Sequence, residues 1–459
     1  MTRPAADPNL PLPYPFPPGE LGTPPPLLDW ARKRQPVCPV ALPSGDPVWM
    51  VTRKEDITRV LTDPGFSRNL TYPGAPRFVG DDFTSVPGGI FNLDPPDHTR
   101  VRRVISRFYS RSAVERHRSM IEDHAVRLLD DMTHGPNPAD LIPAYAAALP
   151  LRVAREILAV PPELHSAYHD CFRTQTHLAA SAEAVAAATT AITDFTREVI
   201  ETKRRDPDPD EPIGALIRAR SGGLISEDEL IGTTSYLFVT GSEPLTAPLA
   251  TGVITLLTHP RQLRDCITAP DLWPKAVEEI LRYHHNGVLG MPRVATTDVT
   301  LHDVTIRKGE GVCCPMLGAT HDPAHYPNPS RFNIHRTTDA SATFGAGPHF
   351  CLGAPPGPPL PADRLPVPLH PLPVPLPRRP RTRDSLGGKP PLHQTREPPR
   401  RLVTAAAGPD PRRRRMLIRW PASQRDRTAT GRAGAGYGES RRRRLWRRGE
   451  WRRAGRWGC

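Results

Sequence analysis

The chain has 459 residues, of which 59 are proline and only 6% are aromatic, and this composition excludes one hydrophobic core along the whole length. The formal net charge of +13 arises entirely in residues 355–459, where 26 Lys and Arg residues stand against 7 acidic residues. Residues 1–354 hold 35 basic and 41 acidic groups, a net charge of −6, so their charge gives no reason to expect nucleic acid as a partner.

The proline-rich segment of residues 1–26 contains no apolar run of the roughly 18 residues that a membrane span requires, and no hydrophobic region of a signal peptide. The 7 cysteines are scattered and include no Cys-x-x-Cys pair, which argues against a disulfide framework or a zinc ribbon. Such cysteine usage is typical of a reducing compartment. We therefore expect a soluble, cytoplasmic protein without a membrane partner.

Residues 27–354 form the part of the chain that the sequence predicts to fold. The segments that start at Ser112 and Ser181 place apolar residues at spacings of three and four, which is typical of surface helices. Short alternating runs start at Asp46 and Asp298 and indicate β-hairpins. We find neither an internal repeat nor an alternation of strands and helices. The expected fold class is mainly α, with small β-sheets at the margin.

The longest predicted helix follows Ser226, which forms a capping box with Glu229, and it extends over about nine turns. Such a length requires burial through the centre of the domain. Gly241 and Pro244 fall in its middle, and because proline cannot donate to the carbonyl four residues before it, we predict a kink there. A break in a core helix usually serves a functional site, and a plain packing kink is the alternative.

Residues 344–353 read FGAGPHFCLG and predict a shaped loop around one cysteine. Gly345 and Gly347 allow a tight turn with positive φ before Cys351, and they leave backbone N–H groups free to point at its sulfur. Because such donors stabilise a thiolate, Cys351 is a candidate nucleophile, metal ligand or redox thiol. A buried inert cysteine is the alternative. His349 is too near along the chain to face the sulfur across a pocket.

This pattern resembles the haem-binding loop of the cytochrome P450 family, and further motifs of that family occur in order over residues 27–354. The resemblance implies a cytochrome P450-type helical fold in which haem b lies between the kinked central helix and the cysteine loop. It implies that Cys351 is the axial thiolate ligand of the iron. It also implies that Phe344, Gly345 and His349 are cofactor-binding residues of the loop.

Two upstream motifs extend the resemblance to the haem propionates. In DPPDHTRVRR, His98 and Arg102 are four residues apart and therefore lie one helical turn from each other. The family resemblance implies that both bind propionates, together with Arg293 of GMPRVAT. Arginine and histidine donors suit this task, because carboxylates form strong charge-assisted hydrogen bonds with them.

A third motif implies an ion-pair network behind the haem. Glu279 and Arg282 of EEILR are three residues apart, so they lie on one helix face and can pair. The family resemblance implies that Arg331 of YPNPSRF completes the network.

The central helix departs from the family pattern Ala-Gly-x-Glu/Asp-Thr-Thr, because this chain reads TGSEPL from residue 240 and lacks both threonines. The first threonine hydroxyl normally helps to relay protons to bound oxygen. Glu243, beside Gly241, is retained and is the candidate that leads a water chain. Thr246 lies past the usual pair, about 100° further round the helix from the second position, so it is a weak substitute.

The resemblance implies a haem-thiolate monooxygenase of secondary metabolism, because a thiolate ligand favours O–O cleavage over simple O2 carriage. We expect a small apolar or aromatic natural product as the substrate. The lost threonines leave a second interpretation open, which is oxidative C–C or C–N coupling without oxygen insertion. Residues 1–354 contain neither a flavin domain nor an iron–sulfur motif, so a ferredoxin or flavodoxin is the expected electron donor.

Residues 355–459 are predicted to be a disordered Pro- and Arg-rich tail. The prolines after Ala354 are incompatible with the proximal helix that the family places there, since each internal proline costs about 3 kcal/mol. A change of reading frame is the most economical interpretation, and it predicts an incomplete haem domain that lacks the proximal helix and C-terminal strands. An inactive remnant is therefore an alternative. Nucleic-acid binding by the arginine runs is disfavoured, because the tail has almost no lysine and no regular aromatic spacing.

Overall fold

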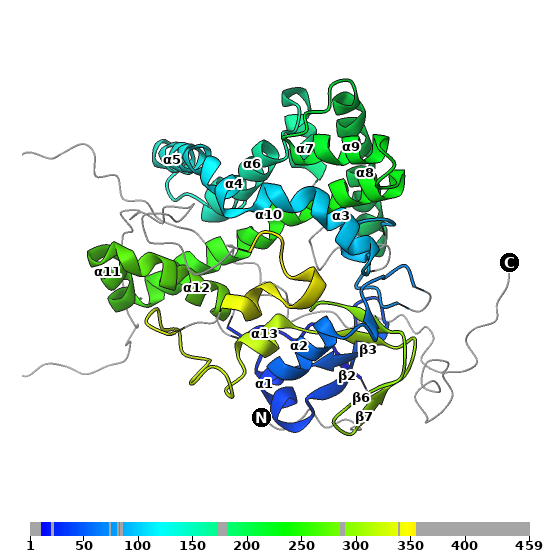
Figure 1. Cartoon of the computed structure of the whole chain (residues 1–459). Coiled ribbons are helices and arrows are strands. Elements are labelled where there is room, and N and C mark those ends of the chain that lie inside the picture. The colour runs from blue at the N-terminus through cyan, green and yellow to red at the C-terminus, as the bar shows by residue number, and fades with distance from the viewer. Residues whose placement is uncertain are drawn as a thin grey trace, which may run out of the picture.

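The protein is described by a computed structural model, which covers residues 11–19, 23–72, 75–79, 82, 86–171, 181–284, 290–337 and 340–354. Helices make up most of these residues, and the small sheets lie on one side of the molecule (Figure 1). The predicted fold class is thereby confirmed. Residues 355–459, where the tail was predicted, lie outside the described residues.

The helices follow the chain in this order: α1 (Pro26–Arg34), α2 (Lys54–Thr62), α3 (Asp97–Ile105), α4 (Arg111–Arg116), α5 (Arg118–His134), α6 (Ala148–Ile157), α7 (His165–Cys171), α8 (Ala182–Arg204), α9 (Pro212–Ser221), α10 (Glu227–Thr258), α11 (Pro260–Thr268), α12 (Trp273–Tyr283) and α13 (Met316–Thr320). The strands are β1 (Leu12–Pro13), β2 (Val37–Ala41), β3 (Pro47–Val51), β4 (Phe66–Ser67), β5 (Arg293–Ala295), β6 (Val299–Leu301), β7 (Val304–Ile306) and β8 (Gly311–Cys313).

Among the described residues, six strands form one sheet in the order β1-β2-β3-β8-β5-β4, and β6 and β7 form a separate hairpin. Both runs that alternate in the sequence are found as strands. Strand β3 pairs antiparallel with β2, and β6 pairs antiparallel with β7, where Thr300 lies opposite Thr305. The predicted hairpins are confirmed, and the sheet brings β5 of the later chain beside β4 of the early chain.

The folded core begins earlier than the predicted boundary at residue 27. Leu12 pairs with Val40 of β2, and Leu12, Tyr14 and Phe16 are buried against the sheet. These three apolar side chains alternate along the chain, so one face of this extended segment packs inward. Proline is compatible with such a strand at the sheet edge, because an edge strand needs few of its N–H groups.

The central helix α10 has the length and the start that the sequence predicts. Ser226 accepts a hydrogen bond from the N–H of Glu229, whose carboxylate accepts one from the N–H of Ser226. The helix extends over 32 residues, continues through Pro244 and Pro248, and packs against α6, α8 and α12. Figure 1 shows it passing through the middle of the molecule.

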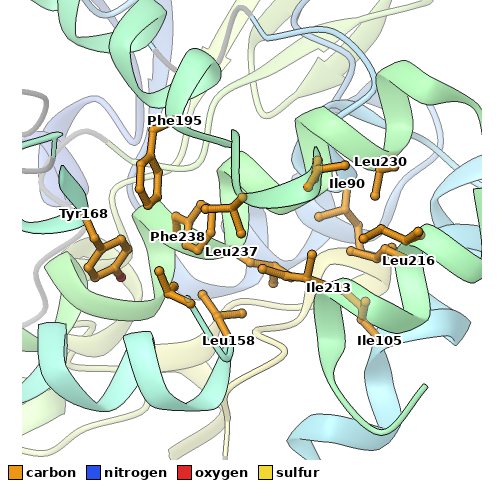
Figure 2. Close-up of a cluster of buried hydrophobic side chains, with 14 of the residues drawn as sticks. Ile90, Ile105, Leu158, Tyr168, Phe195, Ile213, Leu216, Leu230, Leu237 and Phe238 are labelled. Atoms are coloured by element: carbon orange, nitrogen blue, oxygen red, sulfur yellow. The ribbon is translucent and has the colours of Figure 1, made fainter. Parts of the chain in front are cut away.

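An aromatic cluster fixes α10 against α7 and α8. The rings of Tyr168, Phe195 and Phe238 lie with their centroids 5.4 to 5.9 Å apart (Figure 2). All three side chains are buried, and burial of one such ring contributes about 1.5–3 kcal/mol. The cluster therefore holds one side of α10 in place, so that its other side can border a site.

Candidate cofactor site

The loop before Cys351 has the backbone conformation that its glycines predict. Gly345 has φ of +81° and Gly347 has φ of +70°. A Cβ atom on Gly347 would lie 2.6 Å from the carbonyl oxygen of Leu61, so this position also needs glycine for space. The N–H of Cys351 donates to the carbonyl of Phe344 at 3.0 Å and closes the loop. Residues 340–349 pack against α2, α12 and α13.

The Cys351 thiol receives backbone donors, but they come from Gly353 and Ala354 after the cysteine rather than from the glycine turn before it. The residue is exposed to solvent, yet neighbouring atoms crowd the sulfur, and this loss of hydration raises the pKa of the thiol. The N–H groups of Gly353 and Ala354 donate to the sulfur and lower its pKa, as does the positive charge of Arg102. Since loss of hydration dominates, the thiolate needs a further positive charge, which a bound metal ion supplies.

Helix α3 contacts the cysteine loop through both residues that the sequence singles out. The buried ring of His98 lies 4.2 Å from the ring of His349, measured between centroids. Arg102 donates to the carbonyls of Pro348 and Phe350 at 3.2 and 2.7 Å. These contacts attach α3 to the loop that presents the thiol, although the two segments are about 250 residues apart in the chain.

Both histidines are held in their neutral form. Burial, together with the charge of Arg102, lowers the pKa of His98 to about 4. Burial also lowers the pKa of His349, and the nearby charges of Arg293, Arg68 and Arg102 lower it further. Nε2 of His349 has no hydrogen-bond partner among the described residues. A neutral imidazole can offer an N–H to an anion, so the unused nitrogen suits an incoming carboxylate.

Strand β5 adds Arg293, and a residue that the sequence analysis missed, Arg68, joins it. Both side chains are buried, and both donate through Nη1 to the carbonyl of Pro292, at 3.0 Å from Arg293 and 3.1 Å from Arg68. Burial lowers the pKa of Arg293 to about 10. Arg68 follows β4 in a stretch without a family motif, so no pattern in the sequence marked it.

These arginines lack a negative partner within the described part of the chain. No carboxylate there lies within 4 Å of a guanidinium nitrogen of Arg68, Arg102 or Arg293. Arg68 and Arg293 are buried with only the more distant charges of Asp82 and Asp94 to oppose theirs, so a bound anion would stabilise them. A haem group presents two carboxylates beside an iron that a thiolate can ligate. The arginines, the histidines and the Cys351 thiol therefore fit haem.

The predicted ion pair behind the cysteine loop is present. Arg282 donates two parallel hydrogen bonds to Glu279, at 2.7 and 2.8 Å, and both side chains are fully buried. Arg282 also donates to the carbonyl of Thr320 at 3.0 Å. The bidentate pair lies within α12, and the hydrogen bond to Thr320 joins α12 to α13, which packs against the turn that starts the cysteine loop.

The prediction that Arg331 completes this network is wrong. Arg331 is exposed, whereas Nε of Arg336 lies 3.2 Å from Glu279 Oε2. Arg336 also donates to the carbonyls of Pro327, Asn328 and Arg331, which holds the loop between them closed. The loop turns back after Arg331, so the arginine that reaches Glu279 stands five residues later in the chain.

This correction predicts different stabilities for two arginine variants. Arg336→Met should lower the free energy of unfolding by about 2–4 kcal/mol, because it removes a cation from a buried network and leaves several carbonyls without their donor. The matched change Arg331→Met should stay within about 0.5 kcal/mol. Urea denaturation followed by circular dichroism measures both. Equal losses in the two variants would contradict the assignment of Arg336.

Helix α10 carries the three candidate catalytic residues Gly241, Glu243 and Thr246. A Cβ on Gly241 would lie 3.2 Å from the Cβ of Ala154, so the close approach of α6 gives one reason for a glycine here. Thr246 is half-buried and Pro244 is exposed. The side chain of Glu243 lies outside the described part of the structure. Catalytic roles of Gly241, Glu243 and Thr246 thus stay predictions.

Comparisons with known proteins agree with the fit to haem. A family model described as Cytochrome P450 matches residues 265–355. Mycinamicin IV hydroxylase/epoxidase of Micromonospora griseorubida is 36% identical over 336 residues, which are 71% of this chain and 82% of that protein. Nocardicin C N-oxygenase of Nocardia uniformis subsp. tsuyamanensis is 33% identical, over 70% of this chain and 81% of that protein.

Solved structures give the same result. A crystal structure of a putative thioether synthase involved in the tailoring step of griseoviridin superposes with a TM-score of 0.69 at 33% identity, and covers 75% of this chain and 87% of that one. Mycinamicin VIII C21 methyl hydroxylase, bound to mycinamicin VIII, superposes with a TM-score of 0.68 at 29% identity, over the same 75% of this chain and 87% of that one.

The chain belongs to the cytochrome P450 family, whose members are haem-thiolate oxidoreductases. Its bacterial relatives include hydroxylases, an epoxidase and an N-oxygenase, several of them tailoring enzymes of secondary metabolism. Within the described residues, no helix combines the length and the apolar composition that crossing a membrane requires.

Proposed function

We propose that this cytochrome P450 is a monooxygenase that oxidises a small apolar or aromatic natural product. The observation that carries the proposal is the set of arginines and neutral histidines around the cysteine loop, of which Arg68 and Arg293 are buried cations. In this proposal Cys351 is the axial ligand, while His98, Arg102, Arg293 and His349 hold the propionates. When bound, thiolate-ligated haem supplies O2 activation through O–O cleavage.

A small cavity beside α10 has a lining whose chemistry agrees with this substrate class. The cavity lies between the turn Ile90–Asn92, α8 and α10, and its lining includes Phe91, Ile192, Tyr236 and Val239. Thr189, Thr193 and Ser235 add hydroxyl groups to this mostly apolar wall. The cavity itself is smaller than a natural product, so the substrate class is proposed chiefly from the bacterial relatives, several of which are tailoring enzymes of secondary metabolism.

The electron donor is proposed to be a ferredoxin or a flavodoxin that docks beside the cysteine loop, in the cytoplasm. Arg102 contacts the loop from α3, and the exposed residues Arg103, Arg107 and Arg111 follow on the same stretch of chain. A positively charged surface next to the thiol would attract an acidic redox protein and speed its association.

The second candidate reaction is oxidative coupling without oxygen insertion. It is favoured by Pro244, which stands at the position of the family's first threonine and has no hydroxyl to relay a proton. The solved structures that are similar to this chain include that of a putative thioether synthase. Coupling removes two electrons and two protons from the substrate, and both atoms of O2 then leave as water rather than entering the product.

Restoring the two threonines distinguishes the reactions. The wild type and the variant with Pro244→Thr and Leu245→Thr are each supplied with a bacterial ferredoxin, its reductase, NADPH and ¹⁸O2. For a monooxygenase, we expect one ¹⁸O atom in the product and a severalfold higher yield of product per NADPH in the variant. Product without ¹⁸O from the wild type would instead establish coupling. An unchanged yield per NADPH would refute the role assigned to the missing hydroxyl.

We further propose that residues 355–459 lie outside the haem domain. The match to the family model ends at residue 355, where the charge of the chain changes from net negative to strongly positive. A change of reading frame near this position accounts for both features. Sequencing the 3′ end of the gene tests this idea, and an unaltered reading frame would refute it.

A further inference from the structure

We propose that Arg68 is an additional haem-anchoring residue, which donates its free Nη2 group to a propionate beside Arg293. The inference rests on haem as the resident cofactor. Arg68 belongs to none of the motifs by which the chain resembles its family, and the folded chain alone brings it to the site.

The guanidinium of Arg68 is held rigidly by its surroundings. The side chain is 1% exposed. Its Nη1 donates to the carbonyl of Pro292 at 3.1 Å, and its carbon Cζ lies 3.1 Å from the centroid of the Phe91 ring. The backbone N–H of Arg68 donates to Asp94 at 2.8 Å, which fixes the start of the side chain. With the plane and one edge fixed, the direction of Nη2 is fixed as well.

Nη2 of Arg68 is buried and has no hydrogen-bond partner among the described residues. A buried guanidinium without a full set of acceptors is costly, so such a group is found where a ligand completes it. Burial, together with the charge of Arg293, lowers the pKa of Arg68 well below its ordinary value. A carboxylate next to Nη2 would offset the free-energy cost of burying the charged guanidinium.

A propionate suits this place better than a carboxylate of the substrate. Arg68 and Arg293 share the carbonyl of Pro292, so their guanidiniums converge at one point of the site. Nε2 of His349, on the cysteine loop, is also buried without a hydrogen-bond partner among the described residues. Arg68, directly after β4, thus lies beside Arg293 of β5, and both Arg68 Nη2 and His349 Nε2 have room for an acceptor that a propionate would supply.

The test uses the full chain, reconstituted with haem or with haem dimethyl ester, whose propionates carry no charge. Haem release to excess apomyoglobin is followed by absorbance for the wild type and for Arg68→Gln. We expect Arg68→Gln to release haem at least about tenfold faster, because a charge-assisted hydrogen bond is lost. With the dimethyl ester, the two proteins should release the cofactor at nearly equal rates.

Arg32→Gln is the matched control. Arg32 is also buried and also donates to a carbonyl, that of His321 at 2.6 Å, but it lies on α1 away from the cysteine loop. This variant should release haem at the wild-type rate within about twofold. Arg68→Lys, which keeps the charge but not the planar fork, should release haem at an intermediate rate. It serves as the second variant if Arg68→Gln does not fold.

Several results would overturn the proposal. One is that Arg68→Gln releases haem at the same rate as Arg32→Gln. A wild type that retains no haem, and therefore shows no difference from either variant, would count against the proposal in the same way. Another is a tenfold effect that persists with the dimethyl ester, since the effect would then not pass through a propionate. If Arg68 serves a substrate carboxylate, both cofactors leave Arg68→Gln at wild-type rates, and the proposal is refuted in favour of that role.

Discussion

Replacing Cys351 with alanine is expected to abolish the red-shifted Soret band that reduced, thiolate-ligated haem shows with carbon monoxide. The sulfur of Cys351 is presented by a loop whose turn depends on Gly345 and Gly347, and two backbone N–H groups point at it. Alanine preserves the loop and removes only the ligand atom. Difference spectra of the reduced protein, recorded with and without carbon monoxide, measure the loss.

Cys266→Ala provides the matched control for this experiment. Cys266 is buried on α11, and burial raises the pKa of its thiol to about 11, so it has no reason to bind iron. The control should keep the band of the wild type. If Cys351→Ala kept the red-shifted band, another residue would be the ligand. The haem occupancy of the wild-type protein tests whether the chain is an inactive remnant. Full occupancy would contradict that hypothesis.

Glu279→Gln is expected to lower the free energy of unfolding by about 3–5 kcal/mol. The carboxylate of Glu279 is fully buried, accepts two hydrogen bonds from Arg282 and one from the N–H of Asn333 at 2.9 Å, and faces Arg336. Glutamine retains the shape but leaves two guanidiniums without their negative partner. A loss of this size is a large part of the about 5–15 kcal/mol by which typical domains are stable.

Glu278→Gln, at the neighbouring position of α12, is the control. Glu278 is half-buried, and burial raises the pKa of its carboxyl, so removing its charge should cost less than about 1 kcal/mol. Chemical denaturation of both variants in the same buffer gives the two values. Equal stability of Glu279→Gln and Glu278→Gln would mean that the buried pair does not support the fold.

The sequence predicted those features whose geometry is local. The capping box of Ser226 and Glu229 joins residues three apart, and the positive φ values of Gly345 and Gly347 follow from a turn within one loop. Each depends on a few neighbouring residues, so a short pattern is enough to specify it. The pair Glu279 and Arg282 is also within one helical turn, and it was predicted correctly for the same reason.

Predictions that depended on the path of the chain were less successful. Arg336, rather than Arg331, reaches Glu279, because the intervening loop folds back before it approaches α12. The strand that starts at Leu12 was placed in a proline-rich segment outside the folded domain, since its partner β2 is distant in the chain. An arginine suits the contact with Glu279, and an apolar residue suits the contact with β2. In neither case did the sequence specify which residue would make the contact.

The sequence by itself implied the cofactor through its resemblance to the cytochrome P450 family, because the motifs that carry the resemblance are short-range patterns. Only the tertiary structure decided which cations surround the site. Arg68 meets Arg293 because β4 pairs with β5, a contact between residues more than 200 positions apart. Sheet pairing and burial set such long-range contacts, and both depend on the packing of the whole chain rather than on any short stretch of sequence.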